Sequence, residues 1–191
     1  MSKVVSLIIR YVLIILAGLG GLIIFYKSFY PLTFILSSYI LSMFGEVNSF
    51  YTVRLILFNG VSIELINACI AGSAYYLLFI LALSVPDLKI VKRISILLFS
   101  FTLLLLLNVS RIVLMGLIAK TIYFESVHML FWYIVSIIFV VGIWFFSVKL
   151  FSIKKIPVYS DIIYLVENTK TFKQNSKQSK TLKIQKSIKL F

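Results

Sequence analysis

The feature that most constrains this chain is a succession of long apolar segments separated by short polar connections. Hydrophobic residues make up 61% of the 191 residues and charged residues only 13%, which is far from the usage of soluble domains. Segments this apolar must be solvated by lipid, where a helix satisfies its own backbone groups. We therefore predict an all-α polytopic membrane protein.

About 20 apolar residues are needed for a helix to cross the hydrocarbon core of a membrane. By this criterion the sequence predicts five transmembrane helices, at Val4–Tyr26, Phe29–Phe44, Cys69–Val85, Ile94–Ala119 and Met129–Phe151. The second is short and carries Pro31 in its first predicted turn, where proline is tolerated. We assign residues 1–152 to one transmembrane domain and residues 153–191 to a basic tail.

Basic residues near the segment ends predict the orientation, because they favour the cytoplasmic side. The connection at residues 87–93 holds three of them, and the region after the fifth segment is more basic still. Both are expected in the cytoplasm, which leaves residues 45–68 and 120–127 outside. The N-terminus stays open: alternation through five spans places it outside, whereas Lys3 and Arg10 favour the inside.

The C-terminal tail carries much of the net charge of +13, with nine lysines after Ser152 against Asp161 and Glu167. Attraction to anionic lipid headgroups contributes about 1 kcal/mol per basic residue near a membrane surface. Beside this much membrane, headgroups explain the tail better than nucleic acid, so we expect no nucleic-acid partner. A solvated topology anchor is the simpler alternative.

A β-hairpin is predicted at residues 52–66, directly before the third helix. Two apolar runs rich in β-branched residues flank Asn59-Gly60, and this dipeptide suits a two-residue turn because both positions require positive φ. A two-stranded hairpin is marginal alone. We therefore expect it to lie against the helix ends on the extracytoplasmic side and to lead into Cys69.

Three chemically reactive side chains are expected at one depth on three different helices. Cys69 begins the third segment and His128 lies at the head of the fifth, both on the outer side. Arg111 follows Arg93 by 18 residues, or roughly 27 Å at 1.5 Å per residue, close to the hydrocarbon thickness of about 30 Å. Each has a simpler explanation alone, as an apolar filler, an interfacial histidine or a snorkelling arginine. Their shared depth favours a site.

The chemistry of the three groups assigns their roles. A thiol with an ordinary pKa of about 8.5 is mostly protonated at neutral pH, so His128 would accept its proton. The guanidinium of Arg111 and the N-terminus of the third helix would favour the thiolate. Attack on a carbonyl gives an oxyanion that Arg111 can stabilise, and collapse gives a thioester. This chemistry needs no cofactor, and a single cysteine and histidine argue against a structural zinc site.

The segments Cys69-Ile70-Ala71-Gly72 and Asn108-Val109-Ser110-Arg111-Ile112, followed by His128, resemble the exosortase/archaeosortase family. The resemblance runs from the hairpin to about Phe151. It implies a multi-pass cysteine protease/transpeptidase of the plasma membrane, with Cys69, Arg111 and His128 as catalytic residues within residues 1–152 and with a cytoplasmic C-terminus.

The resemblance also implies a substrate class. Such enzymes cleave C-terminal tripartite sorting signals of exported proteins and pass the new carboxyl group to an acceptor, for which a membrane lipid is one candidate. Many members have glycine two residues after the cysteine, where this chain has Ala71. This departure leaves the subfamily and the sorting motif open.

Three further residues are candidates for supporting roles. Asn108 lies one helical turn before Arg111 and is expected to orient its guanidinium, although a polar helix–helix contact would explain it equally well. Glu64 and Glu125 are candidate acidic partners of the site. The alternative to an enzyme is a non-enzymatic membrane scaffold with a lipid- or protein-binding tail; a transporter is disfavoured because no broken helix with paired acidic residues is visible.

Overall fold

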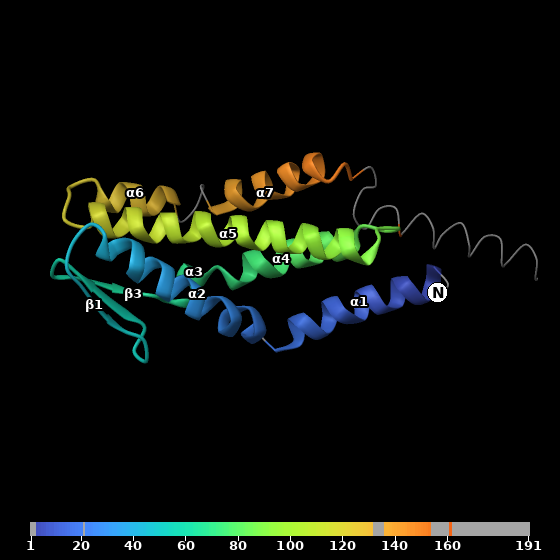
Figure 1. Ribbon diagram of the computed structural model, residues 1–191, viewed down its shortest axis with the longest axis horizontal. Helices are drawn as coiled ribbons and strands as arrows, with labels where there is room; N and C mark the ends of the chain where they lie inside the picture. The colour runs from blue at the N-terminus through green and yellow to red at the C-terminus, as the bar shows by residue number, and fades with distance from the viewer. Residues whose placement is uncertain (1–2, 21, 132–135, 154–160, 162–191) are drawn as a thin grey trace, which may run out of the picture.

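The computed structural model describes residues 3–20, 22–131, 136–153 and 161 (Figure 1). These residues are mostly helical, with one small antiparallel sheet. The helices are α1 (Lys3–Leu19), α2 (Ile23–Ser42), α3 (Asn67–Ile70), α4 (Gly72–Ser84), α5 (Ile90–Ile118), α6 (Phe124–Leu130) and α7 (Ser136–Leu150). The strands are β1 (Val47–Phe50), β2 (Leu55–Phe58) and β3 (Val61–Glu64). The predicted tail at 153–191 falls almost entirely outside the described residues.

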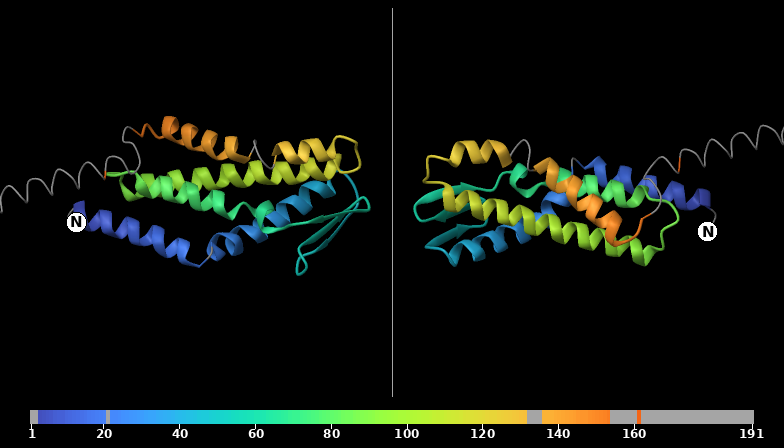
Figure 2. Two further views of the ribbon diagram at one scale, coloured as in Figure 1. Left: turned by 180° about the vertical axis from the view of Figure 1, so that it is seen from behind. Right: turned by 90° about the horizontal axis from the view of Figure 1, so that it is seen from above.

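The helices run along one long axis, which gives the molecule two distinct ends (Figures 1 and 2). The sheet, the end of α2 and α6 lie at one of them, here called the sheet end. The start of α1 and the connection between α4 and α5 lie at the other, here called the basic end. Helix α5 extends from the basic end to the sheet end and contacts α2, α4 and α7.

Within the described part of the chain, α5 is the one helix that is long and apolar enough to cross a membrane by itself. The pair α1 and α2 meets the same criterion if it is counted as one broken span, and α4 and α7 are shorter apolar helices. The position predicted for the fourth span, Ile94–Ala119, agrees with α5. The first two predicted spans have a different boundary between them, and the third predicted span is divided between α3 and α4.

The first two predicted spans differ most from the structure. Instead of breaking at residues 27–28, the chain bends by 70° between α1 and α2, where the sequence has Gly20-Gly21 and where Leu22 has a φ of 64°. Adjacent glycines lower the cost of leaving the helical conformation. Because α2 begins at Ile23, Pro31 lies inside the helix and not in its first turn.

The third predicted span is divided, and residues 132–135 of the fifth lie outside the described residues. Cys69 lies in the single turn of α3, and Ala71 separates it from α4. His128 lies within the seven-residue α6, and α7 begins at Ser136. Cys69 was expected to open a long helix and instead lies in a short one before it. Hydrophobicity did not reveal the break at Ala71 because the residues around it are largely apolar.

The predicted hairpin is confirmed as β2 and β3, joined by Asn59-Gly60 and paired from Phe58↔Val61 to Leu55↔Glu64. Both turn residues have positive φ, 48° and 81°. A third strand, β1, pairs with β2 and was not predicted. Its sequence, Val-Asn-Ser-Phe, has only two residues that favour strands, Val47 and Phe50, and its pairing with β2 determines its conformation.

One face of the sheet packs against α2 and α5 and forms a core around Leu41, Ile56 and Ile112. A second core, between α2, α4, α5 and α7, contains the stacked rings of Phe29 and Tyr75, with centroids 3.6 Å apart. Between α5 and α7, Ser100 and Ser147 form a buried hydrogen bond of 3.0 Å. Such bonds join helices whose surfaces are otherwise apolar.

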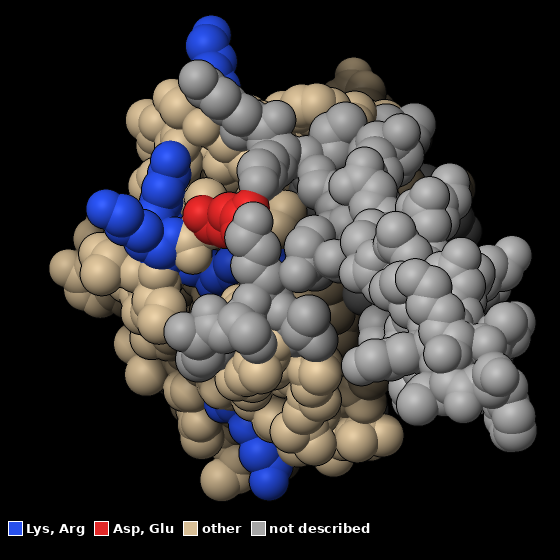
Figure 3. All heavy atoms as spheres, turned by 90° about the vertical axis from the view of Figure 1, so that its right-hand side faces the viewer, with Lys and Arg blue, Asp and Glu red and all other residues tan. Residues whose placement is uncertain are grey.

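Buried charge ties the basic end together. The Arg10 guanidinium of α1 donates to Asp161 Oδ1 at 2.9 Å and to the Leu83 carbonyl at 3.1 Å. Arg93 of α5 donates to the carbonyls of Leu83 and Val85 at the end of α4. The start of α1 therefore lies beside the connection between α4 and α5, and basic side chains are visible on this face (Figure 3).

Candidate active site

Cys69 is held in a one-turn helix whose geometry depends on the residues around it. The chain is extended at Ile66, turns through α3, and takes a left-handed conformation at Ala71, with φ 58° and ψ 36°. The Cys69 N–H donates to the Ile66 carbonyl at 2.9 Å and the Ala71 N–H to the Asn67 carbonyl at 3.2 Å. This turn separates the thiol from α4, so the support expected from the N-terminus of a long third helix is absent.

Helix α5 fixes the α3 turn through two side chains one helical turn apart. The amide of Asn108 donates to the backbone carbonyl of Cys69, and the Arg111 guanidinium donates to the Ala68 carbonyl at 3.2 Å. The prediction that Asn108 and Arg111 share a face is therefore confirmed. Asn108, expected to orient the guanidinium, instead binds the backbone of the cysteine itself.

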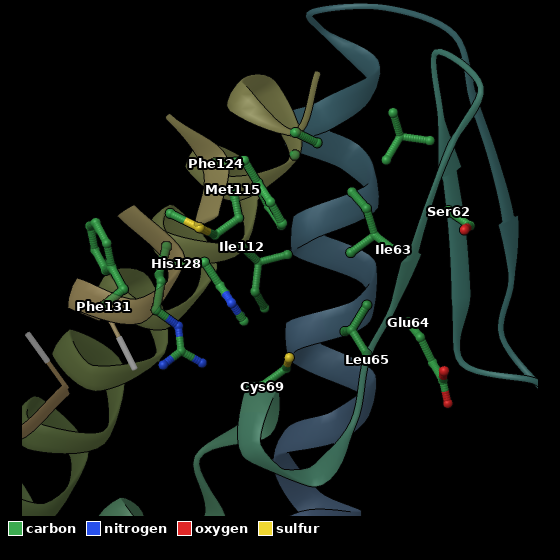
Figure 4. Close-up of a pocket in the computed structure, with 14 residues that line it drawn as sticks. Ser62, Ile63, Glu64, Leu65, Cys69, Ile112, Met115, Phe124, His128 and Phe131 are labelled. Atoms are coloured by element: carbon green, nitrogen blue, oxygen red, sulfur yellow. The ribbon is translucent and has the colours of Figure 1, made fainter. Parts of the chain in front are cut away.

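A cavity of ≈ 210 Å³ opens between β3, α3, α5 and α6 (Figure 4). Cys69, Arg111 and His128 all line it, so the structure brings the three predicted residues to one site. Most of the remaining wall is apolar, formed by Val61, Ile63, Leu65, Ile112, Met115, Gly116, Ala119, Phe124 and Phe131. A reaction here would take place in a region of low polarity that strengthens electrostatic contacts.

His128 enters the cavity from α6. Its imidazole stacks on the ring of Phe124, with centroids 5.5 Å apart and an interplanar angle of 5°. Figure 4 shows the imidazole directed toward the sulfur of Cys69 across the cavity. Both residues are half-buried, so the pair is open to an incoming substrate.

The two candidate acidic partners, Glu64 and Glu125, lie differently relative to the cavity. Glu64 lines the cavity, but its carboxylate points away from Cys69 and His128 (Figure 4). Glu125 is exposed and does not line the cavity. Neither therefore acts as a third member beside His128 in this arrangement.

Arg54 helps to hold the α3 turn that carries Cys69, a role that was not predicted from the sequence. It has a φ of 57° before β2, donates to Asn67 Oδ1 at 3.0 Å, and lies over the Tyr30 ring at 5.0 Å. It thereby connects the loop after β1 to the α3 turn that carries Cys69. The available signal was that Arg54 is the one basic residue between positions 45 and 68.

Comparison of the chain with protein-family models, with curated proteins and with solved structures finds no match.

Proposed function

We propose that the chain is an integral-membrane cysteine protease/transpeptidase. The observation that carries this proposal is that Cys69, Arg111 and His128, far apart in sequence, line one largely apolar cavity. An apolar wall, a thiol, a base and a fixed cation are the parts that acyl transfer through a thioester requires.

Exposed apolar side chains support placement in a membrane. Large hydrophobic residues on every long helix are exposed, including Ile15 58%, Leu16 56%, Ile24 58%, Ile35 60%, Leu98 63%, Ile137 65% and Phe145 67%. Contiguous apolar surface of this kind needs lipid or a partner to cover it. Together with α5, it favours a plasma-membrane protein.

We propose four crossings in place of five. The pair α1–α2 forms one bent crossing, and α3–α4, α5 and α6–α7 form the others. The N-terminus, the 87–93 connection and the C-terminal tail then lie in the cytoplasm, and the sheet end lies outside. Five crossings would place the N-terminus outside, whereas the charges of Lys3 and Arg10 favour the inside. Four crossings remove this conflict, because an even number of crossings places both termini on one side.

The reaction follows from the arrangement of the three groups. The Cys69 thiol gives its proton to His128, and the thiolate attacks the substrate carbonyl to form a C–S bond. The oxyanion develops beside the Arg111 guanidinium. Collapse breaks the C–N bond, the amine leaves with the proton from His128, and a thioester remains. An incoming nucleophile then attacks the thioester and releases the thiol.

The substrate class comes from the resemblance to exosortases and archaeosortases: exported proteins with C-terminal tripartite sorting signals, and a membrane lipid as candidate acceptor. A site at the sheet end faces the extracytoplasmic side, where such proteins arrive. The lysines of residues 153–191 would bind anionic headgroups on the opposite side.

The test compares the C-termini of exported proteins by mass spectrometry in cells carrying the unmodified chain or single variants. Cys69→Ala and Arg111→Ala should leave C-terminal segments uncleaved while the amount of the membrane protein is unchanged. Ser110→Ala is the matched control, because its hydroxyl is exposed and donates only to the Leu106 carbonyl at 2.8 Å. Normal processing by Cys69→Ala would reject the proposal and favour a non-enzymatic scaffold.

A further inference from the structure

Strand β3 is an edge of the sheet. The strand order is β1-β2-β3, and among the described residues no strand pairs with the side of β3 away from β2. An edge strand presents a row of backbone N–H and C=O groups on which another chain can pair. The question is whether this edge faces solvent or the site.

The cavity at Cys69 extends around this edge. It is lined by five successive residues, Val61 to Leu65, and by none of β2. Side chains alternate between the two faces of a strand, so a cavity on one face would contact every second residue. In Figure 4, Ile63 and Leu65 point toward the cavity, whereas Ser62 and Glu64 point away. The cavity therefore reaches the latter two residues along the free side of the strand.

The register defines which backbone groups are available there. The two-residue turn makes Val61 a hydrogen-bonded partner of β2, and the Leu65 N–H donates to the Arg54 carbonyl at 2.8 Å, four residues further on. Bonded and non-bonded pairs alternate in an antiparallel ladder. Ser62 and Glu64 therefore direct their backbone groups away from β2, and the Ser62 N–H and C=O and the Glu64 N–H are aimed along the cavity side.

The geometry points to binding of the substrate as an extended segment that adds to β3 as a fourth, parallel strand. This inference rests on the proposed role of Cys69. Strand β3 begins at the Asn59-Gly60 turn, at the sheet end, where Lys120 Nζ donates to the Asn59 carbonyl at 2.7 Å. From this turn the chain runs along β3 toward Cys69. A polypeptide with its exported part outside and its C-terminal part in the membrane enters in the same direction. Strand addition is a general mode of peptide recognition.

The walls of the cavity specify the side chains that such a segment should carry. Met115 of α5, Phe124 of α6 and Phe131, which follows α6, line the cavity with apolar side chains. An added strand turns every second side chain toward one face. The substrate is therefore an extended segment with apolar residues at alternate positions and its scissile carbonyl at the Cys69 end.

The probe is a pooled library of acetyl tetrapeptidyl chloromethyl ketones with all four side chains varied, applied to the purified full chain in lipid nanodiscs. The sulfur of Cys69 displaces chloride, forming a C–S bond as the C–Cl bond breaks, and the thiol proton passes through His128 to solvent. Because Cys69 is the single cysteine, the adduct mass reports its alkylation directly. Chloroacetone, which has the same warhead and no peptide, is the control reagent.

The peptide reagents should alkylate Cys69 about a hundredfold faster than chloroacetone, as three added backbone hydrogen bonds with Ser62 and Glu64 would allow. N-methylation at one of the two middle residues should slow the reaction about fivefold, the effect of one hydrogen bond, while N-methylation at the other changes it little. Ser62→Pro should lower the ratio of the peptide rate to the chloroacetone rate, because proline lacks the N–H that points away from β2. Ser62→Ala should retain this ratio.

Equal effects of N-methylation at both positions, or no advantage of the peptides, would overturn strand addition. This measurement uses the unmodified protein and so does not depend on the folding of Ser62→Pro. Failure of the proposed function looks different: chloroacetone would then react with Cys69 no faster than with glutathione and at a rate independent of His128.

Discussion

At the scale of single residues, the turn at Ala71 and Gly72 connects the cysteine to its helix. Ala71 adopts a left-handed conformation that costs an L-residue roughly 1–2 kcal/mol. A Cβ added at Gly72 would lie 2.5 Å from the Tyr26 ring, closer than atoms can approach. The first position therefore tolerates alanine at a cost, and the second requires glycine.

These two positions should respond to mutation in opposite directions. Ala71→Gly should stabilise the protein by about 0.5–1 kcal/mol, since relief of strain exceeds the extra entropy of glycine in the unfolded chain. Gly72→Ala should destabilise it by about 1–3 kcal/mol through overpacking. Thermal unfolding of the purified protein in detergent measures both changes. Adding Tyr26→Ala to Gly72→Ala removes the clash and should recover part of the loss; no recovery would contradict the assignment to this contact.

At the scale of elements, α5 positions the cysteine through the clamp that Asn108 and Arg111 form on the α3 turn. Asn108→Ala leaves the carbonyl of Cys69 without its donor, at a cost of about 1–3 kcal/mol. We also expect slower alkylation of Cys69 by chloroacetone, because the turn is less firmly held. Asn108→Ser keeps a shorter donor and tests for partial rescue. Unchanged alkylation in Asn108→Ala would show that the bond serves stability alone.

The elements also show what could be predicted from the sequence. Helix α5 and the Asn59-Gly60 hairpin were predicted because length, hydrophobicity and turn chemistry each act locally. The sharing of one cavity by Cys69, Arg111 and His128 followed from helix rise and charge bias. The helix breaks at Leu22 and Ala71 were missed because the residues on both sides are apolar, so the length of an apolar segment does not reveal where its helix ends. Strand β1 and the contacts of Arg54 were missed because partners distant in sequence determine them.

At the scale of the whole molecule, the proposed topology depends on the bend of 70° between α1 and α2. Arg10 and Asp161 are nearly buried, with side chains 9% and 5% exposed, and they lie beside the end of α4. Charges are rarely buried without a partner, so this ion pair ties the start of α1 to the C-terminal side of the chain. The four-crossing topology proposed above places the start of α1 and the 87–93 connection on one side of the membrane, in agreement with this contact.

The topology can be tested with a protease-sensitive tag ahead of Met1 and single cysteines at Asp87 and Thr121 in a Cys69→Ala background. In intact cells, a membrane-impermeant maleimide should label the cysteine at Thr121 and not the one at Asp87, and added protease should spare the tag. Permeabilisation should expose both protected sites, because basic connections remain in the cytoplasm. A tag that is cleaved in intact cells while Asp87 stays protected would restore α1 and α2 as two separate crossings and place the N-terminus outside. With four crossings, the tag becomes cleavable and the cysteine at position 87 becomes labelled under the same condition, which is permeabilisation.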